Sequence, residues 1–462
     1  MVNKIELSDK NFYIWDQEEK LNNESIESYI QSYLSGNELK RITVYNDYYG
    51  GDNTEILKYH KDRKNRRVTP NNCIPTGYYS TIIDTMAGFM FSNIQYTSEQ
   101  ESDENFIESL NAVLDNNNSD VKDMESGVNA LAYNKAIELV YTVGDSVNKP
   151  EIKFTSIDPR QMLLIYNDDI EPLLLCGIRI TLSNNKDYDY MIDVIYKDEW
   201  QYYYLKNGKL SSRKESKTLL FSECPVIVYR AEILTDKSPF NIVIPYIVAL
   251  DNVVTGNSDD IDKLTDAILI LTKMLDADTL KNLKELKAIS GMDEKDRVEY
   301  VEKNNSPEFR QYVSKLLINE IHKHSHVVDW YNPDSGISGD ASAKALRTRL
   351  FDMSMYSKRL EKVYIKGLKK RIKLIAEMMK ITDQGYGNIS IKLNREIPSE
   401  FLDLAPVLNN LEFISTPSKL EMLGMNVEKE IKKLDEEKTA NVARFMQESR
   451  VTDGVTNEED DN

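Results

Sequence analysis

The sequence predicts an α+β fold in which helices predominate. Apolar residues recur at helical spacing over residues 241–264, 306–325 and 343–380, in the second half of the chain. Residues 136–230 instead alternate between apolar and polar side chains, as half-buried strands do. With 462 residues the chain is long enough for roughly two to four domains, since domains usually have ~100–200 residues.

The first third of the chain indicates helices separated by turns. Residues 22–60 predict helical pieces around a loop at 45–53, where Gly50 and Gly51 permit a turn. A helix is expected from about 77 to 92, because apolar residues such as Ile82 and Met86 recur one turn apart, and another from about 103 to 116. We expect these helices to be packing elements.

The middle region predicts strands and a hairpin. Asn207-Gly208 is a two-residue turn sequence typical of antiparallel hairpins. Two later segments, 297–303 and 388–398, also read as single strands within the more helical part of the chain. These signals place the main sheet before residue 230.

The helix predicted after residue 241 has two distinct faces. Ile247, Leu250 and Val254 lie on an apolar side. Polar residues return to nearly the same angle at steps of three, four or seven, and form a second face that we expect to be acidic and exposed: Asp251, Thr255, Ser258, Asp259, Asp262 and Asp266.

The longest helical pattern covers residues 341–380 and would be about 60 Å long at ~1.5 Å per residue. Pro333, Gly336 and Gly339 precede it and interrupt regular structure. Residues 446–462 are polar and acidic, and we expect them to be disordered.

Composition narrows the function classes. Asp+Glu is 76 against Lys+Arg 58, a formal net charge of −18, which disfavours wrapping or groove reading of nucleic acid because phosphate binding depends on basic side chains. Cys73, Cys176 and Cys224 are far apart, which fits free thiols in a reducing, cytoplasmic compartment. There is no secretory signal and no apolar run of ~20 residues, so we expect a soluble protein without membrane contact.

Motifs for chemistry are largely missing from the sequence. No phosphate-binding loop, nucleophile elbow, HExxH helix or dinucleotide-binding turn occurs, so we expect no enzyme, catalytic residue or cofactor. His322, His324 and His326 have a spacing that can hold zinc or copper. Because Glu320 and Asp329 are the only adjacent carboxylates, we favour a solvated or inter-subunit helix end over a metal site.

Five segments occur in an order that matches one known family. They are NDYYGGDNTEILK (46–58), residues 67–98, IDPRQMLLIYNDD (157–169) followed by GIRIT (177–181), VALDNVVTGNSDDID (248–262), and DWYNPDSGISGDASAKAL (329–346). Together they resemble the portal proteins of siphophages, the family typified by the portal of the Bacillus phage SPP1. The resemblance covers about residues 42–437.

The resemblance implies a portal-type fold assembled as a ring, commonly of twelve subunits. It assigns residues 1–240 and 381–397 to the wing, 241–264 and 306–325 to two stem helices, and 265–305 to the clip. Residues 326–342 would be the channel loop, 343–380 the long wing helix, and 398–445 the crown.

The resemblance also implies a function and partners. Double-stranded DNA would be packaged, retained and ejected through the ring at the capsid vertex of the virion, after assembly in the host cytoplasm. The clip would bind the large terminase motor and later the head-to-tail adaptor, and the ring would meet major capsid and scaffolding proteins. The alternatives are another structural or scaffold component of a phage tail or phage-like particle, and a hydrolase with dispersed carboxylates. A large homo-oligomer would favour the portal and a monomer the others.

Two sets of residues are predicted to face the channel. The polar face from Asp251 to Asp266 is expected to line it, because acidic residues repel DNA and prevent adhesion; exposure on the outer wall is the alternative. The loop is expected to project into the channel and to take several conformations, because its polar side chains can satisfy their own backbone. Its residues include Asp329, Trp330, Tyr331, Asn332, Pro333, Asp334, Ser335, Gly336 and Gly339.

Overall fold

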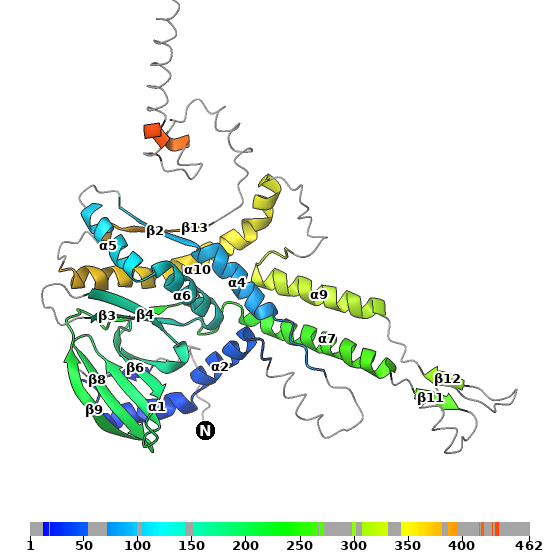
Figure 1. The fold of residues 1–462 in the computed structure, drawn as a ribbon, viewed down its shortest axis with the longest axis horizontal. Helices are drawn as coiled ribbons and strands as arrows, with labels where there is room; N and C mark the ends of the chain where they lie inside the picture. The colour runs from blue at the N-terminus through cyan, green and yellow to red at the C-terminus, as the bar shows by residue number, and fades with distance from the viewer. Residues whose placement is uncertain are drawn as a thin grey trace, which may run out of the picture. The chain divides into compact units, whose positions relative to one another are not determined.

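The structure is a computed structural model that describes residues 13–17, 19–53, 72–98, 104–143, 151–265, 268–271, 298–301, 307–330, 343–380, 387–395, 415, 417–419, 427 and 430–433. The chain divides into two compact units, residues 1–331 with 350–396 and residues 332–349 with 397–462. Helices and sheets both contribute, and about half of the fold is helical (Figure 1). The fold is therefore mixed α+β, with less predominance of helix than the sequence predicts.

A six-stranded sheet forms one side of the first unit. Its strand order is β1-β5-β6-β7-β8-β9, antiparallel except for the parallel pair β1–β5. The strands are β1 (Tyr13–Trp15), β5 (Met162–Asn167), β6 (Leu174–Leu182), β7 (Tyr190–Ile195), β8 (Glu199–Lys206) and β9 (Lys209–Thr218). Asn207 and Gly208 both have positive φ, 49° and 76°, so the hairpin predicted at this dipeptide is confirmed.

Helix α1 (Asn23–Ser35) packs on this sheet. Asn22 caps its N-terminus, since the Asn22 side chain accepts a hydrogen bond from the Ser25 amide. Its buried residues Ile26, Ile30 and Tyr33 share a core with strand residues such as Leu163 and Ile178. Ile26 and Ile30 lie one turn apart on one face of α1, and alternate residues of each strand lie on one face of the sheet. These two faces pack against each other.

A second sheet has the strand order β10-β3-β4 and packs against α6, which in turn contacts three other helices. Its strands are β10 (Val226–Tyr229), β3 (Ala136–Val143) and β4 (Glu151–Ile157). The neighbouring helices are α2 (Asn37–Tyr49), α4 (Tyr78–Phe91), α5 (Glu104–Asn116) and α6 (Ser119–Tyr133), and α6 contacts both β3 and β4. Single-turn 3-10 helices lie at η2 (Pro159–Gln161) and η3 (Asn241–Val243).

The long helix predicted at 341–380 is confirmed as α10 (Ala343–Met378). Buried apolar residues recur along it at steps of three, four or seven and form a stripe: Leu350, Met353, Leu360, Tyr364, Leu368, Ile372 and Ile375. Leu374 and Ala376, near its end, are buried as well. Near it, β2 (Asn93–Thr97) pairs antiparallel with β13 (Ser390–Asn394), so segments from both ends of the chain share a two-stranded sheet (Figure 1).

One predicted boundary differs in the structure. The loop expected at 45–53 is wrong for residues 45–49, which continue α2 to Tyr49. Tyr45 and Tyr48 are buried and their rings contact the ring of Tyr79 on α4, so packing favours helix where the sequence indicated a turn. The crown at 398–445 and the tail at 446–462 lie mostly or wholly outside the described residues.

Candidate functional site: the α7–α9 helical pair and its junctions

Two helices lie side by side in the region assigned to the stem. They are α7 (Ile244–Thr265) and α9 (Pro307–Ser325), and they flank β11 (Ile268–Leu271) and β12 (Val298–Val301), which pair antiparallel (Figure 1). Both helices and the strand predicted at 297–303 are confirmed. The names stem and clip remain predictions.

A hydrogen bond and a ring stack connect the described parts of the two helices. Arg310 Nη1 donates a hydrogen bond to Asn257 Oδ1 over 2.8 Å, and the rings of Tyr246 and His324 stack with centroids 5.2 Å apart. Among the described residues of α9 before its last turn, Ile321 is the one buried apolar side chain. On α7 the described residues add Ile247 and Leu250, so within the described part of the two helices the pair has a small core.

An extended segment, residues 72–76, binds one face of α7. The amide of Asn72 donates to Asp259 Oδ1 over 2.8 Å, and the amide of Ile74 donates to Thr255 Oγ1 over 3.2 Å. Alternate residues of an extended chain are ~6.6 Å apart and every fourth helical residue is ~6 Å apart, so the two spacings match. The helix thus supplies acceptors at the interval at which the extended chain presents its amides.

Asp251 continues this set of contacts one turn earlier. Its Oδ1 accepts hydrogen bonds from the amide of Thr76 at 2.8 Å and from the Thr76 hydroxyl at 2.5 Å. Its Oδ2 accepts one from Asn53 Nδ2 at 2.5 Å. These donors replace water around the carboxylate, which is why it can be buried.

The expectation that this acidic face is exposed is wrong for two carboxylates. Asp251 is 1% exposed and Asp259 is 3% exposed, because residues 72–76 cover them. Thr255 and Ser258 are half-buried. The side chain of Asp262, and Asp266, lie outside the described residues. A position of this face toward a channel stays a prediction.

The histidines at the end of α9 contact different elements. His322 Nδ1 donates to the backbone oxygen of Val327 over 2.9 Å, and its Nε2 is 3.8 Å from Asp329 Oδ1. The Nε2 of His324 is 3.2 Å from Glu320 Oε2 and 3.3 Å from the hydroxyl of Tyr246 on α7.

His326 connects the end of α9 to α10. It has a positive φ of 58°, which ends the helix, and its Nδ1 is 2.8 Å from Asp352 Oδ2. Its ring stacks on Tyr356 with centroids 4.3 Å apart. The three rings thus serve three separate contacts, and the described residues contain no group of three or more His, Cys, Asp or Glu that could hold a metal ion.

The predicted channel loop begins where these contacts end. Asp329 is half-buried beside His322, and Trp330 is exposed. Tyr331, Asn332, Pro333, Asp334, Ser335, Gly336 and Gly339 lie outside the described residues. Its projection and mobility remain predictions.

Sequence reasoning missed a buried ionic cluster around Arg371 of α10. Arg371 Nε and Nη2 donate to the two carboxylate oxygens of Glu138 on β3, at 2.8 and 2.5 Å. Its Nη1 lies 2.6 Å from Asp123 Oδ1 of α6, without hydrogen-bond geometry. Tyr229 of β10 also donates to Glu138. The sequence signal that could have indicated this cluster is the position of Arg371 among the apolar residues of the buried face of α10.

Burial sets the electrostatics of this cluster. Desolvation raises the pKa of the Asp123 carboxyl, and the nearby Arg371 guanidinium opposes this. Arg371 lies between two carboxylates, and its pKa is raised well above the usual range despite its burial. The cluster joins α6, β3 and α10, so it links elements of the part of the first unit outside the α7–α9 pair and the strands β11 and β12, which we call the body.

The helical pair also leaves large apolar side chains of α9 exposed, among them Phe309 and Tyr312. The sequence matches the family described as phage portal protein, SPP1 Gp6-like, over residues 33–443. The chain belongs to this family of structural, non-enzymatic proteins.

The other comparisons give either no match or a match of low sequence identity. No curated protein matches the chain. Among solved structures, a chain from the neck of a native GTA particle computed with C12 symmetry is 12% identical, with a TM-score of 0.43; the match covers 76% of this chain and 90% of that one. A chain from the neck of an empty GTA particle computed with C6 symmetry is 13% identical, also with a TM-score of 0.43, and covers 77% and 91%. Within the described part of the chain, no helix is both long and apolar enough to span a bilayer.

Proposed function

We propose that this protein forms the ring-shaped portal at the capsid vertex, through which double-stranded DNA is packaged, retained and ejected. The observation that carries the proposal is the family match, which extends over residues 33–443. In this proposal α7 and α9 are the stem helices and the region of β11 and β12 is the clip, which binds the packaging motor and the head-to-tail adaptor. The ring, commonly of twelve subunits in this family, would be part of the virion.

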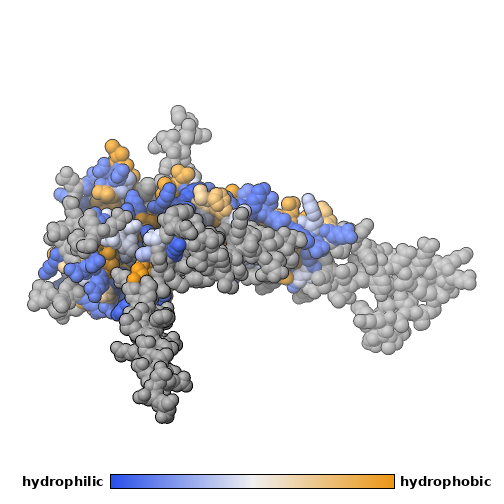
Figure 2. All heavy atoms as spheres, turned by 90° about the horizontal axis from the view of Figure 1, so that it is seen from above, coloured by the Kyte–Doolittle hydropathy of each residue, from blue (hydrophilic) through white to orange (hydrophobic). Residues whose placement is uncertain are grey.

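The surface of α9 supports assembly into a ring. Phe309, Tyr312 and Leu316 are 66%, 64% and 45% exposed, and their spacing of three and four residues places them on one face. Apolar and hydrophilic residues are mixed on the described surface seen from above in Figure 2. Contiguous exposed apolar side chains on a helix indicate a partner, and a head-to-tail contact between copies closes into a ring.

The contacts of α7 refine the proposed channel lining. Asp251 and Asp259 accept hydrogen bonds from residues 72–76 of the same chain, so we leave them out of the proposed channel lining. Thr255 accepts a hydrogen bond from Ile74 of the same segment. Of the predicted polar face we therefore assign Ser258, Asp262 and Asp266 to the channel side, and the channel loop to residues from Asp329 onward. Acidic and small polar residues there would let a polyanion pass without adhering.

The α9 stripe gives a direct test. We expect purified protein to form rings in electron micrographs, and Phe309→Ser, Tyr312→Ser and Leu316→Ser combined to abolish them with little change in the unfolding temperature. The matched control replaces Ile170, Leu182 and Leu220, which are exposed apolar residues of the body, by serine and should keep the rings. A parent protein that stays monomeric at all concentrations would refute the proposed function.

A further inference from the structure

A row of lysines follows the exposed face of α10. Lys358, Lys362, Lys366 and Lys369 are all exposed, and steps of four, four and three residues place them on one side of the helix. The row is about 16 Å long at ~1.5 Å per residue. Of the acidic residues of α10, Glu361 lies on another side of the helix. Asp352 and Glu377 lie closer to the side of the row, near the two ends of the helix, and they bind His326 and Ser222.

The row carries uncompensated charge. Within the described part of the chain no ion pair involves any of its four ammonium groups, although other cations of the same region are paired. Lys370 and Lys373 both contact Glu223, and Arg395 contacts Glu361. Glu223 and Glu361 are thus bound by other cations, and within the described residues no carboxylate pairs with the row, which can therefore bind an external anion.

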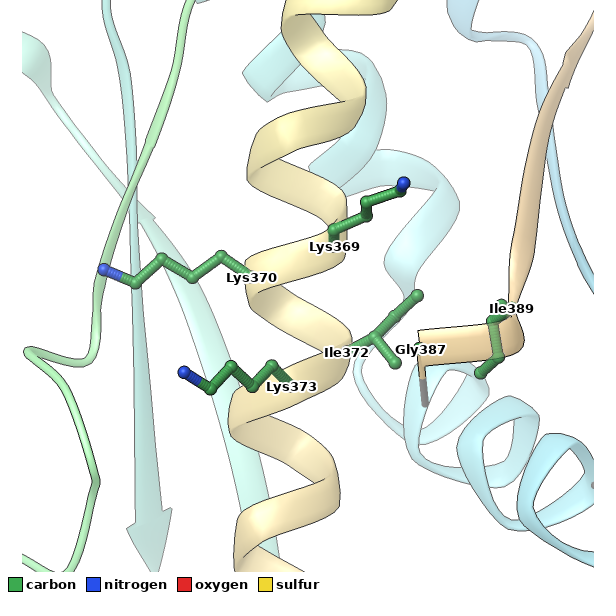
Figure 3. Close-up of a pocket in the computed structure, with 6 residues that line it drawn as sticks. All are labelled: Lys369, Lys370, Ile372, Lys373, Gly387 and Ile389. Carbon is green, nitrogen blue, oxygen red and sulfur yellow. The ribbon is translucent and has the colours of Figure 1, made fainter. Parts of the chain in front are cut away.

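A pocket extends the basic surface at one end of the row. It has a volume of about 250 Å³ and is lined by Lys369, Lys370, Ile372, Lys373, Gly387 and Ile389 (Figure 3). Figure 3 shows Lys369 and Lys370 extending to different sides of α10. This fits the assignment of Lys370 to Glu223 and of Lys369 to the unpaired row.

The net charge of the whole chain does not cancel this local field. The chain carries −18, but charges farther than about 8–10 Å apart are largely screened at physiological salt. Four ammonium groups that form no ion pair with the described residues therefore present a positive surface to a polyanion that comes close. Phosphates of one DNA strand follow each other every ~3.4 Å along the helix axis, so the row spans about five of them.

We propose that Lys358, Lys362, Lys366 and Lys369 bind the phosphate backbone of double-stranded DNA without sequence preference. This inference rests on the proposed function, which brings DNA to the protein, and adds a DNA-binding surface on the body, distinct from the α7 side of the channel. Lysines on flexible stems suit a partner that moves past, because each contact is weak and the phosphates are interchangeable.

The test uses the full chain with the four lysines of the row replaced by glutamine. The control variant replaces four exposed, dispersed lysines by glutamine, and so changes the net charge equally: Lys40, Lys186, Lys197 and Lys206. Binding of a 30-bp DNA duplex of random sequence is followed by fluorescence anisotropy between 25 and 150 mM NaCl.

The row variant should bind at least about tenfold more weakly at low salt, and its slope of log affinity against log salt should fall by about 3 to 4, since each phosphate contact contributes ~0.9. The dispersed control should change much less. Equal losses in both variants would show only a net-charge effect, and no loss in the row variant would show a solvated face; either result overturns the proposal.

Assembly separates this inference from the proposed function. If the row variant alone loses ring assembly, the lysines bind an acidic surface of a second copy, and the DNA assignment is wrong. If the parent forms no rings, the portal function fails, while the anisotropy measurement still decides the role of the row. As a direct readout, DNA should protect the four lysines from acetylation in the parent, measured by mass spectrometry, with Lys206 as the unprotected reference.

Discussion

The body and the α7–α9 pair differ in how far they bury their side chains within a single chain. In the body, α10 places Arg371 between Asp123 and Glu138 and packs Gly367 directly against Tyr229. In the pair, α9 buries little before its last turn and presents apolar side chains outward. The body therefore completes its packing within one chain, whereas the proposed function assigns the exposed apolar face of the pair to neighbouring subunits.

This contrast predicts where a substitution destabilises the chain and where it only affects assembly. Changes inside the body should lower the free energy of unfolding of a single chain. Changes on the pair should leave that free energy almost unchanged and alter contacts made by residues 72–76 or by other copies. The predictions below test this difference, from the largest effect to the smallest.

Arg371→Leu should be the most damaging change. It leaves Asp123 and Glu138 buried without their shared cation, and removal of one partner from a buried ionic group costs ~3–5 kcal/mol. The measurement is urea unfolding, and failure to fold at all would agree with it. The control is Lys362→Leu at an exposed position of the same helix, which should change stability by less than about 0.5 kcal/mol. Equal effects of the two changes would contradict the structural role of the cluster.

Gly367→Ala and Gly256→Ala compare the two regions with the same chemical change. A Cβ at Gly367 would lie 2.3 Å from Tyr229 Cδ1, so overpacking should cost ~1–3 kcal/mol. No atom lies within 4 Å of a Cβ at Gly256 of α7, so alanine there should be neutral or stabilise the helix by up to ~1 kcal/mol. Unfolding of the unassembled protein measures both. A large loss at Gly256 would mean that α7 packs more tightly in the single chain than the structure shows.

The elements that the sequence predicted well are those that depend on local patterns. The stripe of α10 and the Asn207-Gly208 turn need only neighbours along the chain to be recognised. The family resemblance, carried by short segments in order, also led to the correct family.

The errors arise where a distant segment decides the outcome. Asp251 and Asp259 look like solvated residues of an acidic face, and nothing near them in sequence shows that residues 72–76 cover them. Residues 45–49 look like part of a loop before Gly50, but contact with Tyr79 stabilises them as helix. In both cases the partner is far away in the sequence, so periodicity could not indicate it.

Asp251→Asn tests the attachment of residues 72–76 to α7 and should have a local effect. The carboxylate accepts hydrogen bonds from the amide and the hydroxyl of Thr76 and from Asn53. Asparagine keeps one acceptor oxygen, but its NH2 group replaces the other oxygen. That NH2 group then faces a partner that is itself a donor. Hydrogen bonds to a charged acceptor contribute ~1.5–3 kcal/mol each, so loss of one should speed exchange of the Thr76 amide by roughly 10- to 100-fold.

Hydrogen exchange of single amides distinguishes this local opening from global unfolding. The amide of Ile74, which donates to Thr255, should change less than that of Thr76 because its acceptor is intact. Asn252→Asp, at the next and exposed position of α7, is the control and should leave both amides unchanged. If the Thr76 amide exchanged at the parental rate in Asp251→Asn, the Asp251 carboxylate would not be what holds residues 72–76 on α7. Asp251 would then again be a candidate for the channel lining. If all amides of the body exchanged faster as well, residues 72–76 would belong to the core of the body, and the contrast between the two regions would be smaller than proposed.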